Sequence, residues 1–424
     1  MTQRPPHIRL ISLLPALTRA VRSRLASRGV WLSAALLLTS CTQPPAQKVE
    51  PPPVALVPEV RSYSSGSLTD YGEARLERVA QQLRAGQQSS HIIQLGDSHT
   101  AADFFTGSLR KALQQRYGNA GPGWVPPARI RGQRSGALKL GEVAAKDWEL
   151  TSSRLQTHAN FAPGGFVLQP LRSGSRVQLA HYTPEATPLR VRALYHSPEP
   201  VSVLINQQSV TWPATDDWQW SAAQQLRLPL ELETIADTYP QLGGWLVENN
   251  QPGVLLSSLG INGATIHMLD KWGQGWQSPL QALQPDLLIL AYGTNEAFND
   301  DLDGDHYYAS LTRHIEDLRA QQPQAALLMI GAPDVIKHAA EHSCQSRRPA
   351  QLSHVQAIQR KVAREQQLLF WDWQAMMGGA CSFPEWQAQG LAQKDGVHFS
   401  AEGYALSAHA LYEDLENHLQ GVAP

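Results

Sequence analysis

The stretch "IIQLGDSHTAADFF" (residues 92–105) places a polar, reactive group directly after a run of apolar residues. Apolar residues followed at once by Gly96-Asp97-Ser98-His99 are typical of a buried strand that ends at the edge of a parallel sheet. Ser98 is either a nucleophile at that edge or part of a polar turn, because Asp and Ser also cap helices. The rest of the chain decides between these two interpretations.

The composition is that of a globular protein that can bury a large core. Its 424 residues are 42% hydrophobic and 17% charged, which fits one large domain or two moderate ones. The formal net charge of −2 argues against a broad basic surface of the kind that binds nucleic acid or anionic lipid without sequence preference. We expect no nucleic-acid partner, and the oligomeric state stays open.

Residues 1–41 have the features of a secretory leader. Six arginines precede the apolar run "VWLSAALLLTS" (30–40), which is too short to span a bilayer comfortably. Leu38-Thr39-Ser40-Cys41 resembles the lipobox of bacterial lipoproteins, in which the cysteine carries the lipid. The alternative is a leader that is cleaved elsewhere. We expect an exported, periplasmic lipoprotein that is anchored to the outer membrane through Cys41, with a Pro-rich tether over residues 42–60.

If Cys41 carries lipid, Cys344 and Cys381 form an even pair in a compartment that permits disulfides. We predict that these two cysteines are bridged; the alternative is two free thiols. A zinc site is less favoured, because the chain has no Cys-x-x-Cys spacing. We therefore expect no metal.

Strand and helix patterns alternate along most of the chain, with one long interruption. Buried strand patterns such as "PDLLILAYGTNE" (285–296) are followed by helical ones, and one helix is predicted from about Ala101 to Arg116. Residues 119–253 consist instead of short, partly alternating runs separated by Pro, Gly, Asn and Ser. The pattern predicts a doubly wound parallel sheet interrupted by an antiparallel β module.

Three of the predicted strands lead to residues suited to acyl transfer. A serine hydroxyl needs a base, and the base needs an orienting carboxylate; His398 and Asp395 in "DGVH" (395–398) supply these types. The charge that develops on a carbonyl oxygen needs N–H donors, which Asn295 and the turn "GINGAT" (260–265) are suited to provide.

These four blocks, in this order, resemble those of the SGNH hydrolases, also called GDSL esterases and lipases. The resemblance implies a three-layer, flavodoxin-like α/β/α fold that needs no cofactor. It also implies that Ser98 is the nucleophile, that Asp395 orients His398 as the general base, and that the N–H groups of Ser98 and Gly263 and the amide of Asn295 form the oxyanion hole. Gly260 is the alternative donor in the second block. His99 stands where the commonest family pattern has Leu, which is of interest for substrate choice.

Within this superfamily the chain is most similar to the peptidoglycan O-acetylesterases of Gram-negative bacteria. "GDSHTAADFF" (96–105), "YGNAGPGW" (117–124) and a β-sandwich inserted between the first and second blocks carry this resemblance. It implies an acetylated glycan as substrate: peptidoglycan acetylated at the muramoyl C6 hydroxyl, cleaved through an acetyl-serine intermediate. Two alternatives remain: an O-acetyltransferase with the same triad and a non-catalytic, glycan-binding lipoprotein.

The inserted module resembles carbohydrate-binding domains and contains several tryptophans. Trp212, Trp218, Trp220 and Trp245 either stack on sugar rings or belong to the sandwich core. The predicted organisation is a leader with lipobox (1–41), a tether (42–60), the first part of the hydrolase domain (61–118), the inserted β-sandwich (119–253) and the second part of the hydrolase domain (254–424).

Overall fold

The computed structural model describes residues 65–421, apart from 158–159, 184, 186, 236–238, 274 and 338–342. Cys41, the predicted leader and the predicted tether therefore lie outside the described residues. In the described part of the chain, no helix combines the length and the apolar character needed to cross a membrane.

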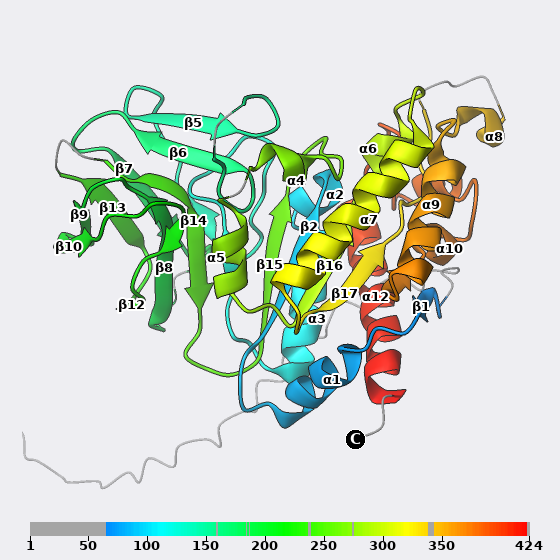
Figure 1. Ribbon diagram of the computed structural model, residues 1–424, viewed down its shortest axis with the longest axis horizontal. Helices are drawn as coiled ribbons and strands as arrows, with labels where there is room; N and C mark the ends of the chain where they lie inside the picture. The colour runs from blue at the N-terminus through cyan, green and yellow to red at the C-terminus, as the bar shows by residue number, and fades with distance from the viewer. Residues whose placement is uncertain are drawn as a thin grey trace, which may run out of the picture. The chain divides into compact units, whose positions relative to one another are not determined.

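A six-stranded sheet lies at the centre of the predicted hydrolase domain (61–118 and 254–424, below called the hydrolase part), with the strand order β1-β18-β17-β16-β2-β15 (Figure 1). The strands are β1 (Leu68–Asp70), β2 (Ser90–Gly96), β15 (Val254–Gly260), β16 (Leu287–Ala291), β17 (Ala326–Ile330) and β18 (Leu369–Trp371). The last five in chain order are parallel, and β1 pairs antiparallel with β18 at one edge. This order confirms the predicted flavodoxin-like, doubly wound sheet. β1 is not predicted from the sequence, because it has only three residues.

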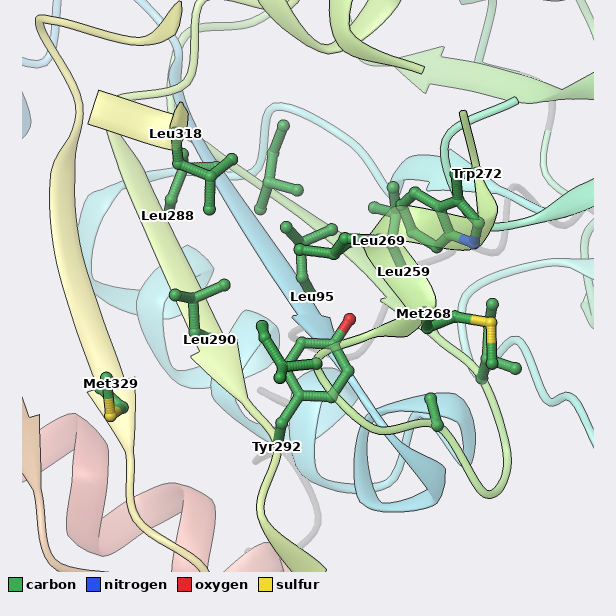
Figure 2. Packing of buried hydrophobic residues seen from close by; sticks show 14 of the residues in the cluster. Leu95, Leu259, Met268, Leu269, Trp272, Leu288, Leu290, Tyr292, Leu318 and Met329 are labelled. Atoms are coloured by element: carbon green, nitrogen blue, oxygen red, sulfur yellow. The ribbon is translucent and has the colours of Figure 1, made fainter. Parts of the chain in front are cut away.

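Helices cover both faces of this sheet. One face carries α1 (Leu76–Ala85), α3 (Phe105–Tyr117) and α12 (Ala401–Gly421), and the other carries α4 (Met268–Lys271), α5 (Gln277–Ala282), α7 (Gly304–Gln321) and α9 (Leu352–Glu365). Successive strand residues point to opposite layers, so Ile92 packs with the first group and Ile93 with the second. Figure 2 shows the second layer, where Leu95, Leu288 and Leu290 lie on the same side of the sheet as Leu318 of α7.

The helix predicted from about Ala101 to Arg116 begins four residues later, at Phe105, which corrects the start of that prediction. The structure has α2 (Ser98–Ala101) and α3, and the turn between them contains Asp103 at a φ of 49°. The Asp103 carboxylate causes this break, because it accepts hydrogen bonds from Thr106 Oγ1 and from the Gly136 backbone N–H, each at 2.6 Å. Asp tolerates the left-handed conformation better than most residues.

Two antiparallel sheets form the inserted β module. The first contains β4 (Lys139–Leu140), β7 (Arg176–Ala180), β9 (Val201–Ile205), β10 (Gln208–Trp212) and β13 (Leu230–Thr234). The second contains β3 (Gly123–Val125), β5 (Trp148–Ser152), β6 (Phe166–Pro170), β8 (Leu189–His196), β11 (Gln219–Trp220), β12 (Gln224–Leu226) and β14 (Gln241–Glu248). Side chains of both sheets share one apolar cluster, so the module is a sandwich.

The tryptophans of the sandwich are packing residues. Trp212, Trp218 and Trp245 are each at most 2% exposed, which leaves no ring face for a sugar. Trp220 is half-buried, and its indole N–H donates to the backbone oxygen of Pro279. The structure therefore favours the core interpretation of these residues.

The sandwich also packs against the hydrolase part. Trp124 of β3 donates its backbone N–H to Ser257 Oγ of β15 at 2.8 Å. Phe161 and Phe166 of the module belong to the same buried cluster as Leu95 and Leu259 of the central sheet. One apolar core is thus shared by the two parts.

A disulfide joins the two cysteines that were predicted to pair. Cys344, at the start of α8 (Cys344–Arg347), is bonded to Cys381, shortly before α11 (Phe383–Ala388). Nearby, the buried Asp334 accepts hydrogen bonds from Arg348 Nε at 2.9 Å and from the Phe383 N–H at 3.0 Å. The disulfide and the buried Asp334 carboxylate, which binds Arg348 and the Phe383 N–H, therefore hold the same two segments.

Candidate active site

The carboxyl ends of three adjacent parallel strands bring the predicted site together. Gly96 at the end of β2 is level with Gly260 of β15 on one side and with Ala291 of β16 on the other. The strand order reverses at β2 and β16, and ligands bind at such a switch point in open α/β sheets. The loops that carry Ser98, Gly263 and Asn295 therefore leave the sheet side by side.

Ser98, His398 and Asp395 form a continuous chain of hydrogen bonds. Ser98 Oγ lies 2.8 Å from His398 Nε2, across 300 positions of sequence. His398 Nδ1 lies 2.7 Å from Asp395 Oδ2. The order hydroxyl, imidazole, carboxylate is the one that nucleophilic catalysis by serine requires.

Local hydrogen bonds fix the Asp395 carboxylate in its ionised form. Burial acts to raise its pKa, but the backbone N–H groups of His398 and Val397 and the His398 ring together hold the pKa of Asp395 below its ordinary value. Both N–H groups donate to Oδ1 at 2.9 Å. An ionised Asp395 accepts a hydrogen bond from the Nδ1–H of His398, so Nε2 carries no proton and accepts the Ser98 hydroxyl.

His99 lies behind this chain of hydrogen bonds. Its ring is 3% exposed, its centroid is 5.5 Å from that of His398, and its Nδ1 is 2.8 Å from Tyr404 Oη. Burial lowers the pKa of His99 to about 3, so the ring is neutral. His99 is therefore a buried packing residue beside His398, and it does not line the pocket that contains Ser98.

The structure brings Gly263 and Asn295 to the serine, and it places Gly260 elsewhere. Gly263 lines the same pocket as Ser98 and has a φ of 75°. A Cβ on Gly260 would lie 2.2 Å from the Ala101 nitrogen, which shows that this glycine serves the close packing of β15 on α2. Asn295 Nδ2 donates to the Ala264 backbone oxygen at 2.8 Å and lies 3.4 Å from Asp97 Oδ2.

Two buried carboxyl groups, to which the sequence analysis gave no role, hold these turns. Glu296 accepts the Ile266 N–H at 2.8 Å and the Gly293 N–H at 3.0 Å, and so joins the second block to the third. Burial raises the pKa of Glu296 to about 7 and that of Asp97 to about 8. Glu296 stands three positions after Gly293 at the start of α6 (Thr294–Ala297), where its side chain accepts the N-cap N–H as the glutamate of a capping box does; a Glu at this spacing is the signal that would have identified it.

The residues that carry the Ser98 hydroxyl, the His398 imidazole and the predicted oxyanion donors line one pocket of about 430 Å³. Four predicted residues line it (Ser98, Gly263, Asn295 and His398), together with four that were not predicted (Arg154, Asn262, Phe298 and Val397). A hollow of about 500 Å³ at the amino ends of the strands contains none of the predicted residues. Chemistry rather than size therefore identifies the site.

Two family models match the chain. Residues 120–231 match the N-terminal region of peptidoglycan O-acetylesterases, and residues 218–406 match the GDSL-like lipase/acylhydrolase family. A search among curated proteins finds no match.

Solved structures extend this comparison. A peptidoglycan O-acetylesterase is 36% identical, with 84% of this chain and 99% of that chain covered and a TM-score of 0.76. An acetylxylan esterase from Geobacillus stearothermophilus is 19% identical, with 38% and 73% covered and a TM-score of 0.30. A family two carbohydrate esterase from Cellvibrio japonicus is 12% identical, with 67% and 98% covered and a TM-score of 0.27, and these last two carry no argument about function. On the first of these matches, the chain is a carboxylic ester hydrolase that belongs to the peptidoglycan O-acetylesterase family.

Proposed function

We propose that the protein removes O-acetyl groups from peptidoglycan by serine catalysis. One observation carries the mechanism: Ser98 Oγ, His398 and Asp395 are joined by hydrogen bonds of 2.8 and 2.7 Å at the wall of a pocket. The likeness to a peptidoglycan O-acetylesterase over 84% of the chain supports the choice of substrate. The acetyl group removed is the one on the muramoyl C6 hydroxyl.

The reaction has two steps of the same kind. His398 Nε2 takes the proton of Ser98, and Oγ attacks the acetyl carbonyl carbon to give a tetrahedral oxyanion. Collapse breaks the bond to the sugar oxygen, which leaves with the proton from His398 while the acetyl group stays on Ser98. Water, deprotonated by His398, then attacks the acetyl-serine and releases acetate.

The N–H groups of Ser98, Gly263 and Asn295 stabilise the oxyanion in this mechanism. One N–H of the Asn295 amide is held by the Ala264 oxygen at 2.8 Å, whereas the contact with Asp97 is long, at 3.4 Å. The raised pKa keeps Asp97 largely protonated at neutral pH, and a neutral carboxyl attracts an N–H less than a carboxylate does. Among the described residues, the second N–H of Asn295 makes only this long hydrogen bond, which it exchanges for one to the oxyanion in the proposed mechanism.

Replacing Ser98 by Ala tests the proposed function. We expect acetate release from O-acetylated peptidoglycan and from nitrophenyl acetate to fall to background, with an unchanged melting temperature. Undiminished release by the Ser98→Ala protein would refute the mechanism. Analysis of the products with and without a glycan acceptor separates hydrolysis from acetyl transfer, and binding without turnover by the unaltered protein would indicate a glycan-binding protein.

We also propose export and lipid attachment at Cys41, on the strength of the lipobox-like sequence at 38–41. The protein would then act in the periplasm from the outer membrane. Incorporation of labelled palmitate into the full chain, and its loss in Cys41→Ser, is the expected result. Equal labelling of both proteins would exclude this site.

A further inference from the structure

A loop of the inserted sandwich reaches the active-site pocket and is fixed there. Ser153, just after β5, is fully buried. Its Oγ accepts the Trp272 indole N–H at 3.1 Å, and its backbone oxygen accepts Lys271 Nζ. Trp272 and Lys271 belong to the hydrolase part, so this anchor sets the position of the next residue, Arg154.

Arg154 lies over the second block of the site. A Cβ added to Gly263 would lie 3.8 Å from Arg154 Nε, which places the guanidinium beside the turn that carries the predicted oxyanion donor. Arg154 is exposed, and it lines the pocket together with Ser98 and His398. The cationic group is therefore open to a substrate whose ester carbonyl reaches Ser98.

The charge of Arg154 is not matched by the pocket wall. Of the eight residues that line the pocket, Arg154 is the only one with a permanent charge. No ion pair between described residues involves it. The nearby carboxyl groups are otherwise engaged: Asp395 binds His398, and Asp97 and Glu296 are buried and bind backbone N–H groups. An anion on the substrate would supply the missing partner.

The chemistry of the proposed substrate provides that anion. A guanidinium presents a planar fork of N–H groups that matches a carboxylate. A muramoyl residue carries a lactyl ether whose carboxyl group bears the stem peptide, and the stem peptide ends in carboxylates, whereas xylan and similar acetylated glycans have none at the acetylated sugar. A carboxylate therefore distinguishes the acetylated muramoyl unit from an acetylated sugar of xylan.

We infer that Arg154 is a specificity-determining residue that binds a carboxylate of the lactyl-peptide portion of the acetylated muramoyl unit. The inference rests on the proposed function and deepens it. It also gives the inserted sandwich a role at the site: the module supplies the group that recognises the acidic part of the substrate, while the hydrolase part supplies the reacting groups.

The test compares Arg154→Gln and Arg154→Lys with Arg227→Gln, a control at an exposed arginine of the same module. The full-length proteins are assayed on acetylated muropeptides, on the same muropeptides with their carboxylates converted to amides, and on nitrophenyl acetate. We expect Arg154→Gln to lower kcat/KM on the acidic muropeptides by about 10- to 100-fold, chiefly through KM, since a hydrogen bond to a charged group is worth this much. Arg154→Lys should retain part of the activity, and Arg227→Gln all of it.

The neutral substrates show whether Arg154 binds a carboxylate of the substrate or acts on the oxyanion. Amidation of the muropeptides should lower the activity of the unaltered protein and remove most of the difference from Arg154→Gln. An equal loss on nitrophenyl acetate would overturn the inference, because Arg154 would then act on the oxyanion. An unchanged kcat/KM on the acidic muropeptides would overturn it as well. Failure of the unaltered protein to release acetate from any acetylated muropeptide would instead refute the proposed function.

Discussion

The two halves of the candidate site are built in opposite ways. The acid–base half, Asp395 and His398, lies at the surface, with 50% and 39% of the two side chains exposed. The oxyanion half, the turns of Gly263 and Asn295, rests on Asp97 and Glu296, which are 1% and 2% exposed. A carboxylate that must stay ionised to orient an imidazole is kept near water, and carboxyl groups that hold backbone turns are buried with raised pKa values.

The halves also differ in how far apart their parts are in sequence. Asp395 and His398 are three positions apart, and one loop supplies every hydrogen bond between them. The bond from Ile266 to Glu296 spans 30 positions, and the contact of Asn295 with Asp97 spans 198. The hydrogen bonds between Asp395 and His398 are therefore local, although the Ile336 N–H also donates to the Gly396 oxygen of their loop at 2.9 Å. The oxyanion half depends on the packing of the whole sheet.

The largest effect is expected from removing the charge of the acid–base half. Asp395→Asn keeps the oxygen that accepts the N–H groups of Val397 and His398, but it no longer favours a proton on His398 Nδ1. We expect kcat on nitrophenyl acetate to fall by roughly four orders of magnitude, with little change in melting temperature. A loss of less than ten-fold would show that the exposed carboxylate is dispensable.

A smaller loss is expected in the oxyanion half. Asn295→Ala removes one donor to the tetrahedral intermediate, which should lower kcat by about 10²- to 10³-fold. Because the amide does not contact the ground-state ester in this mechanism, KM should change little. Steady-state kinetics on nitrophenyl acetate measure both constants. A rise in KM at an unchanged kcat would assign Asn295 to substrate binding instead.

Glu296→Gln probes the buried support of the same half. The amide offers one acceptor in place of two, so one of the bonds to Ile266 and Gly293 is lost, and we expect kcat to fall by about ten-fold. The variant also lacks the ionisable carboxyl group of Glu296. The pKa of Glu296 is raised from 4.5 to about 7, so the folded protein retains a proton that the unfolded chain releases between these pH values.

The unaltered protein should consequently lose stability relative to Glu296→Gln as the pH rises from 4.5 to 7. The slope is at most about 1.4 kcal/mol per pH unit for one group. Urea unfolding at several pH values measures it, with Glu402→Gln as a control at an exposed position of α12. Parallel curves for the unaltered protein and Glu296→Gln would show that Glu296 is ionised in the folded state.

This contrast explains what the sequence could predict. The parallel sheet was predictable because its strands are continuous apolar runs, and the predicted site residues because each stands in a short block that resembles a block of the SGNH hydrolases. Arg154 was not predictable, because its position depends on how a loop of the sandwich packs against the hydrolase part. The break at Asp103 depends on a hydrogen bond from a residue 33 positions later, and β1 is too short to show a period. A short stretch of sequence does not show which distant residues will contact it in the folded protein.

The disulfide offers the smallest expected effect on turnover and the last test of the comparison. Cys344 and Cys381 are 37 positions apart, and a crosslink over a loop of this length stabilises a protein by at most about 4 kcal/mol through the unfolded chain. Neither cysteine lines the pocket. The double Cys344→Ser, Cys381→Ser variant should therefore melt at a lower temperature and keep kcat within about two-fold at 25 °C, because Asp334 still binds both segments, Arg348 through an ion pair and Phe383 through its backbone N–H.

The same variant shows whether the acid–base half is as local as it appears. The chain runs from Cys381 through α11 to the loop of Asp395 and His398. If this loop is fixed by its own hydrogen bonds, reduction of the disulfide changes the melting temperature and leaves the kinetics on nitrophenyl acetate intact. A large loss of kcat at a temperature where the variant is fully folded would mean that contacts distant in sequence fix the position of His398. Both halves of the site would then depend on such long-range contacts.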